Sequence, residues 1–122
     1  MRLILEGYQP ISNNKAQRMH WSKRQKAAED VHWLVKQQLL KILEAKGYWP
    51  CYPKASIRFK VYLSTARAFD PDNFFGGSGK WIIDALKKEG IIVDDSHKHV
   101  KLSVEFHVDK ANPGVEIVIE EV

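Results

Sequence analysis

Residues 55 to 63 carry the most constraining pattern in this chain, an alternation of apolar and polar side chains. One face would hold Ile57, Phe59, Val61 and Leu63, and the other Ser56, Arg58, Lys60 and Tyr62. A period of two residues is typical of a β-strand that buries one face and leaves the other in water. The pattern therefore predicts a strand at 55–63 and, with it, a sheet of which one face is covered.

Other segments supply the rest of that sheet and its cover. Further strands are predicted at 2–6, 100–108 and 115–119, with a short one at 91–93, and the last strand follows a turn at 112–114. Apolar residues at helical spacing predict one helix over 22–46 and a shorter one over 80–88. Ser22 and Gln25 form a capping box for the first helix, and glycines at 47 and 90 end the two helices. The order predicts an α+β fold, a mostly antiparallel or mixed sheet packed against two helices.

Length and cysteine content narrow the class of protein. The 122 residues suffice for one domain, spanning 1–122, and its core needs no disulfide staples. Cys51 is the only cysteine, which excludes intrachain disulfides and thiolate zinc clusters. No apolar run is long enough to cross a membrane, and the N-terminus lacks a secretory pattern. We therefore expect a soluble cytoplasmic protein with no membrane partner, in which oxygen or imidazole groups would hold any metal.

Charge is distributed unevenly along the chain. Residues 1–67 contain 13 Lys and Arg against 4 Asp and Glu, whereas residues 68–122 contain 6 against 11. A basic half suggests a polyanionic partner, and acidic residues gathered elsewhere could hold a cation against it. The alternative is a solvated helix face rich in lysine.

The segment Pro10-Ile11-Ser12-Asn13-Asn14 consists of turn formers and predicts a loop. Basic residues follow it closely, so phosphate contact and simple turn formation are both open for its asparagines. The candidate DNA-binding residues are Asn13, Asn14, Lys15, Arg18, Lys23, Arg24 and Arg67. Such a track would bind phosphates without reading sequence, and its affinity would fall steeply with salt.

Carboxylates recur around the second predicted helix. They are Asp70 and Asp72 in a predicted loop over 69–79, Asp84 on the helix, and Asp94 and Asp95 after it. Mg²⁺ takes one or two such carboxylates and completes its coordination with water and phosphate. The same residues are also ordinary cap and turn formers. The neighbouring Gly76-Gly77-Ser78-Gly79-Lys80 is not a phosphate-binding loop, because Phe74 and Trp81 occupy positions that such a loop reserves for glycine and serine or threonine.

Read together, FDPDNFFGGSGKWIIDALKKEGIIVDD and the upstream PISNNK resemble the RusA family of Holliday junction resolvases over about residues 8 to 105. Asp70, Asp72 and Asn73 match the family's Asp-x-Asp-Asn motif, and Pro10, Ser12, Asn13 and Asn14 match its early loop. Lys80, Asp84-Ala85-Leu86 and Asp94-Asp95 match its lysine, its helix and its acidic pair. The chain departs from the family in the stretch between Asn73 and Lys80, which is longer here.

The resemblance implies a site and a partner. By it, Asp70, Asp72 and Asp95 are the expected ligands of Mg²⁺, or of Mn²⁺, and Lys80 stabilises charge on the scissile phosphate. It also implies a homodimer that cuts branched DNA.

Several of these residues have structural alternatives. Asp84 is interpreted first as a cap or as a partner of Lys80 or Lys88 at helical spacing. Asp94 is interpreted as the cap of its turn, and Asn73 as a residue that fixes the loop. Phe74 and Phe75 are expected to be buried under the loop or in an interface, the alternative being a wedge between bases.

The sequence thus predicts an Mg²⁺-dependent endodeoxyribonuclease that resolves four-way junctions by paired symmetric nicks. The resemblance places it in recombination and repair or in phage-type DNA processing, near the nucleoid. One alternative is a non-catalytic protein that binds branched DNA through the basic half. Another is a broader metal-dependent nuclease that also cuts linear or single-stranded substrates.

Overall fold

The computed structural model describes residues 1–66 and 69–122. They form a single small α+β domain, as predicted. The elements in chain order are β1 (Arg2–Glu6), α1 (Asn13–Arg18), α2 (Trp21–Lys46), β2 (Ala55–Leu63), α3 (Pro71–Phe75), α4 (Ser78–Lys88), β3 (Val100–Val108) and β4 (Gly114–Glu121).

The four strands form one mixed sheet in the order β1-β4-β2-β3. Strand β4 lies between β1 and β2 and is antiparallel to both, whereas β2 and β3 are parallel. Parallel pairing is possible because α3 and α4 lie between β2 and β3 in the chain and supply the long crossover that it requires. The sheet is therefore mixed, with two antiparallel pairs and one parallel pair, as predicted. The turn at 112–114 joins β3 to β4, which are not neighbours in the sheet.

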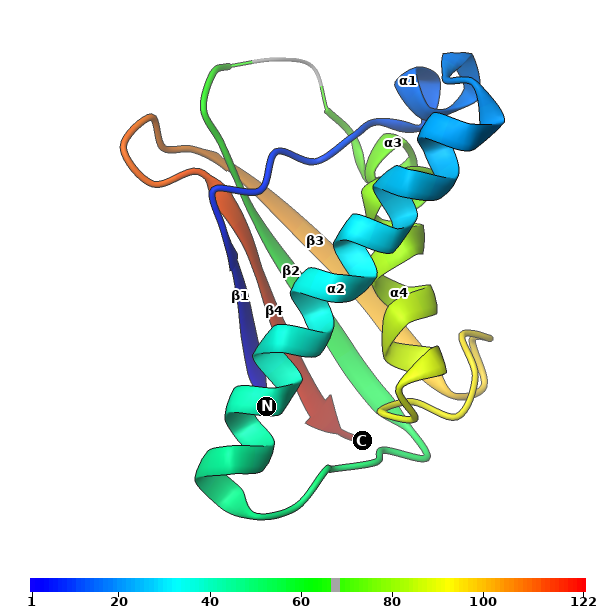
Figure 1. The fold of residues 1–122 in the computed structure, drawn as a ribbon, viewed down its shortest axis with the longest axis vertical. Helices are drawn as coiled ribbons and strands as arrows, with labels where there is room; N and C mark the ends of the chain where they lie inside the picture. Colours follow the sequence, from blue (N-terminus) through cyan, green and yellow to red (C-terminus); the bar gives the residue numbers. More distant parts are fainter. Residues whose placement is uncertain (67–68) are drawn as a thin grey trace.

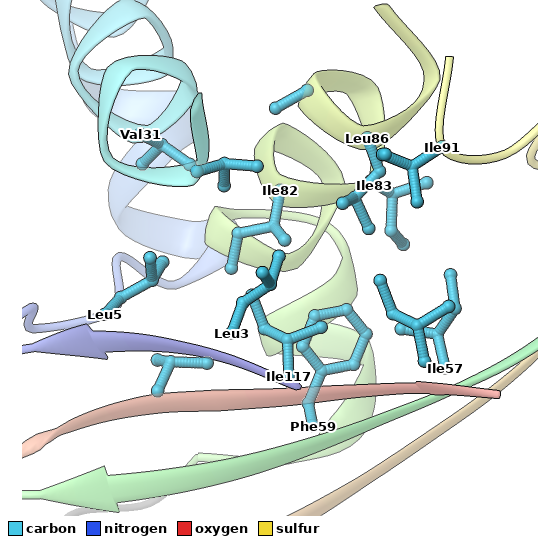
Figure 2. Packing of buried hydrophobic residues seen from close by; sticks show 14 of the residues in the cluster. Leu3, Leu5, Val31, Ile57, Phe59, Ile82, Ile83, Leu86, Ile91 and Ile117 are labelled. Atoms are coloured by element: carbon cyan, nitrogen blue, oxygen red, sulfur yellow. The ribbon is translucent and has the colours of Figure 1, made fainter. Parts of the chain in front are cut away.

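The helices cover one face of the sheet, so the domain has two layers (Figure 1). Alternate side chains of the strands point into the space between the layers, and Phe59, Ile57 and Ile117 there meet Ile82 of α4 and the buried row of α2 (Figure 2). The other face of β2 carries Arg58, which is exposed. The alternation at 55–63 therefore corresponds to one face of β2 buried under the helices and one face turned away from them, as predicted.

Helix α2 begins one residue before the predicted start. Its N-cap is His20, whose Nδ1 accepts the backbone N–H of Ser22 at 3.2 Å. Ser22 therefore lies inside the helix, and Gln25 donates to Glu29 instead of closing a capping box. The other end is as predicted, because Gly47 adopts a left-handed conformation with φ 76°.

Two predicted loops contain short helices. Ser12 caps α1 by accepting the N–H of Lys15 at 3.1 Å, so Asn13 and Asn14 start a helix instead of shaping a turn. In the second, α3 occupies Pro71–Phe75, and α4 starts at Ser78, two residues before the predicted start. Short polar residues favour both turns and helix N-caps, and here they serve as caps. The segment 91–93 forms only an isolated bridge between Ile92 and Tyr52.

An aromatic cluster joins α3 to the sheet. Phe74 is fully buried, and its ring lies edge-on to Phe59 of β2 at 5.1 Å between centroids. Phe69 contacts Phe106 of β3 at 5.5 Å, which ties the chain before α3 to the edge strand. The burial of Phe74 confirms its expected place under the loop.

Helices α2 and α4 are clamped at the end of α4. The carboxylate of Glu89 accepts from His32 Nε2 at 2.9 Å and lies 3.7 Å from Lys36 Nζ, while its backbone oxygen accepts from Trp49 at 2.8 Å.

No helix in the described part of the chain is long and apolar enough to cross a membrane.

Replacing Phe74 by alanine should lower the free energy of unfolding by about 3–5 kcal/mol, because it leaves a cavity at the centre of the aromatic cluster. Urea unfolding followed by circular dichroism measures this. Trp33, which is 61% exposed on α2, is the control, and its replacement by alanine should change stability by about 0.5 kcal/mol. Equal losses for the two variants would contradict the assigned core.

Candidate nucleic-acid interface

Two segments that the sequence singled out separately pack directly against each other. The backbone N–H of Ser78 donates to Ile11 O at 2.9 Å, and Ser78 Oγ accepts the N–H of Ile11 at 2.6 Å. The Ser78 hydroxyl also lies 2.6 Å from the Tyr8 hydroxyl. Ser78 is fully buried, so its one oxygen joins the segment before α1 to the first turn of α4.

The glycines around Ser78 are required by this contact. A Cβ on Gly77 would lie 2.0 Å from Ile11 O, and one on Gly76 would lie 2.7 Å from Asn13 Cγ. A Cβ on Gly79 would lie 2.9 Å from the ring of Phe74. Glycine at these three positions therefore lets the stretch between Asn73 and Lys80 lie close to Ile11, Asn13 and Phe74.

Burial changes the acidity of Tyr8. Desolvation raises the pKa of its hydroxyl above 10.0, and the hydrogen bond with Ser78 partly opposes that rise. The neutral phenol is thus the form that the folded protein favours.

A groove opens where these segments meet the start of α2. Its volume is about 590 Å³, and it is lined by Asn13, Ala16, Gln17, Trp21, Arg24, Gln25, Ala28, Gly76, Lys80, Trp81 and Asp84. Four predicted site residues, Asn13, Arg24, Lys80 and Asp84, therefore come together from α1, α2 and α4. We call this the α1–α4 groove.

Sequence reasoning missed part of the groove. Trp21 is 64% exposed at its edge, and Trp81 is half-buried and lines it. The signal for Trp21 was its place beside the basic residues after α1, because an aromatic ring among cations suits a nucleic acid.

Asp84 forms no ion pair with Lys80 or Lys88 among the residues that the structure describes, so its first interpretation was wrong.

Three basic candidates that the structure describes, Lys15, Arg18 and Lys23, do not line the groove. Lys15 and Arg18 are exposed on α1, where the Arg18 guanidinium donates to Asn14 O at 3.2 Å. Asn14 and Lys23 are exposed as well. Arg67 lies outside the described residues.

Asp70 and Asp72 lie on the helix that precedes α4. Asp70 is the N-cap of α3 and accepts the backbone N–H of Asn73 at 2.8 Å. Asp72 is exposed in the first turn. Asn73 thus fixes the segment through its backbone N–H, as expected. The carboxylate of Asp70 is the acceptor of that hydrogen bond and caps α3.

Asp94 and Asp95 lie beyond the other end of α4. The backbone N–H of Asp95 donates to Asp94 Oδ1 at 2.8 Å, and Lys87 Nζ lies 3.3 Å from Asp94 and 4.0 Å from Asp95. The Asp95 N–H is the larger cause, and the Lys87 ammonium the next, of the lowered pKa of the Asp94 carboxyl. Asp94 therefore caps its turn, as expected.

The carboxylates expected to bind metal are not gathered within one chain. Over residues 1–66 and 69–122, no group of three or more His, Cys, Asp or Glu side chains is placed to hold a metal ion. Asp70 and Asp72 precede α4 and Asp95 follows it; the 11 residues of α4 span about 16 Å. The described residues of a single chain therefore do not fit the Mg²⁺ or Mn²⁺ site that the resemblance implies.

No protein-family model matches the chain, and a search of curated proteins finds no similar sequence. The likeness to the resolvases therefore depends on the motifs themselves.

Replacing Gly77 by alanine should destabilise the protein by about 3 kcal/mol or more, because the backbone oxygen of Ile11 cannot yield to the new methyl group. Gly90, which has φ +75° and open space around it, is the control. Its replacement by alanine should cost about 1–2 kcal/mol through backbone strain alone. Thermal and urea unfolding measure both, and a Gly77 variant no weaker than the Gly90 variant would refute the close approach.

Ser78→Ala should lower the free energy of unfolding by about 1–3 kcal/mol, since it leaves the Ile11 N–H and the Tyr8 hydroxyl without their partner. Tyr8→Phe should cost about 1 kcal/mol, because Ser78 still accepts from Ile11. In the double variant the losses should be less than additive. Additive losses would show that the two hydroxyls do not interact.

Proposed function

We propose that the protein is a structure-selective endodeoxyribonuclease of the Holliday junction resolvase type, dependent on Mg²⁺ or Mn²⁺ and acting on branched DNA. The observation that carries the proposal is the α1–α4 groove. It brings Asn13, Arg24 and Lys80 together from three helices, although the sequence separates them by 67 positions from first to last.

The groove suits a sugar-phosphate backbone. The Arg24 guanidinium and the Lys80 ammonium are exposed cations, and Asn13 adds an amide that can donate to a phosphate oxygen. Trp21 offers an exposed ring on which an unpaired base can stack. A branch point presents both phosphates and unstacked bases, and shape alone can select it without a helix that reads base edges.

The rigid contact beneath the groove supports a role in catalysis as well as in binding. Lys80 follows the buried Ser78 by two residues in the first turn of α4, so its backbone is held by the hydrogen bonds to Ile11. A cation on a fixed backbone is suited to stabilising charge that develops on a phosphate. The carboxylates Asp70 and Asp72 lie on α3, directly before this turn.

The test uses a labelled four-way junction and a linear duplex of the same sequence, each with and without Mg²⁺. Wild-type protein should make paired symmetric nicks in the junction alone and only with metal, and Asp72→Asn should remove the nicks while leaving binding and folding intact. Tight junction binding without nicks under any condition would favour a non-catalytic binding protein. Equal cutting of the linear duplex would favour a broader nuclease.

Binding is tested separately. Arg24→Ala and Lys80→Ala should each weaken junction affinity and lower the slope of log affinity against log salt by about 1, since each removes one phosphate contact. Lys41→Ala, in the second half of α2 and outside the groove lining, is the matched control and should change neither. Equal effects of all three variants would show that the groove has no special part in binding.

A further inference from the structure

Asp84 is a carboxylate in a groove that otherwise suits phosphates. It lines the α1–α4 groove together with the cations Arg24 and Lys80, yet its negative charge repels a phosphate. Its side chain is partly buried and, among the described residues, it accepts no hydrogen bond and forms no ion pair. An ionised carboxylate has acceptors only. A ligand that meets Asp84 therefore has to present hydrogen-bond donors.

A second hollow opens beside Asp84, between α2 and α4, and we call it the α2–α4 hollow. Its volume is about 160 Å³, and it shares Gln25, Ala28, Trp81 and Asp84 with the groove. The two helices pack against each other (Figure 1), and the small side chains of Ala28 and Ala85 leave space between them. A cavity of roughly 150 Å³ holds a benzene-sized ring. The hollow can thus admit the edge of one base while the rest of the base lies in the groove.

Helix α4 gives the hollow a ring, a carboxylate and an ammonium group in succession. Trp81 lies one turn before Asp84 and lines both the groove and the hollow. Lys88, which is exposed, lies one turn after Asp84 and also lines the hollow. Residues three and four apart are neighbours on a helix surface. The three side chains therefore follow one another along one face of α4.

The hydrogen bonds already present in the hollow leave it with free acceptors. His32 Nε2 is taken by Glu89 at 2.9 Å, and Gln25 Nε2 donates to Glu29 at 3.4 Å. Both oxygens of Asp84 accept nothing among the described residues. The hollow therefore offers a ligand a pair of acceptors with a cation beside them.

Among the four bases, guanine matches this arrangement. Its N1–H and N2–H groups are adjacent donors that can meet both oxygens of one carboxylate, and its O6, beside them, accepts from an ammonium group. Cytosine and adenine present one amino group next to an acceptor nitrogen, which would face the second oxygen of Asp84. Thymine has a single N–H between two carbonyl oxygens.

We propose that the α2–α4 hollow binds one unpaired guanine whose phosphate lies in the α1–α4 groove. Asp84 accepts from N1 and N2, Lys88 donates to O6, and the ring stacks on Trp81. The pocket itself stands on these side chains, whereas its use at a branch point rests on the proposed function. There, shape selects the junction and the pocket determines which base at the branch is preferred.

Inosine tests the contact, because it is guanine without the N2 amino group. Oligothymidine strands with one central guanine or one central inosine are titrated with protein in the absence of divalent metal, and fluorescence anisotropy gives the affinities. Wild type should bind the guanine strand about tenfold more tightly, since inosine loses one of the two paired contacts. Asp84→Asn should bind both strands alike, because an amide has only one acceptor oxygen.

Two further variants separate this contact from general binding. Asp30→Asn, exposed on α2 and outside both linings, is the matched control and should keep the tenfold preference. Lys88→Ala should weaken both strands by the same factor, because inosine retains O6. Thermal unfolding verifies that each variant folds. Equal wild-type affinity for the two strands, or binding to neither, would overturn the pocket, and so would a preference that survives Asp84→Asn.

Four-way junctions with guanine or inosine at the branch distinguish a failure of the pocket from a failure of the proposed function. Inosine pairs more weakly with cytosine, so a stiffer branch cannot explain weaker binding of the inosine junction. A junction that is bound and nicked equally with either base would keep the resolvase and overturn the pocket. A guanine preference on the single strands, without nicking of any junction, would keep the pocket and overturn the resolvase.

Discussion

The contact between Ser78 and Ile11 is the constraint on which the rest of the candidate site depends. One buried hydroxyl joins the segment before α1 to the first turn of α4 and also meets Tyr8. The backbones can approach this closely only because Gly77 has no side chain. The position of α1 over the start of α4, and therefore the α1–α4 groove, follows from this contact.

The sheet then determines how far apart the functional groups lie. Its order places β3 at an edge, with the acidic turn after α4 at one end and α3 at the other. Helix α4 runs between them, and its burial against β2 and α2 fixes their separation. This topology brings Asn13, Arg24 and Lys80 into one groove, and among the described residues it gathers no group of carboxylates placed to hold a metal ion.

Most of the fold could be predicted from the sequence, because alternation and helical spacing are local consequences of burial. The strand at 55–63 and the end of α2 at Gly47 are examples. Prediction failed where one residue type serves two local structures: Ser12 and Asp70 were assigned to loops and instead cap α1 and α3. Strand order was not predicted, because pairing depends on contacts between distant segments: β3 and β4 follow each other in the chain and are separated by β2 in the sheet.

By itself, the sequence determined which segments form the two layers and which side chains carry charge, because each follows from residues near one another in the chain. Only the tertiary structure decided that Asn13, Arg24 and Lys80 share a groove, and that no metal-binding group of carboxylates forms within the described part of the chain. The physical reason is that such proximity depends on strand order and on contacts between distant backbones. The glycines at 76, 77 and 79 show this most clearly. In the sequence they are part of a long stretch between two motifs, whereas in the structure they allow Asn13, Ile11 and Phe74 to approach closely.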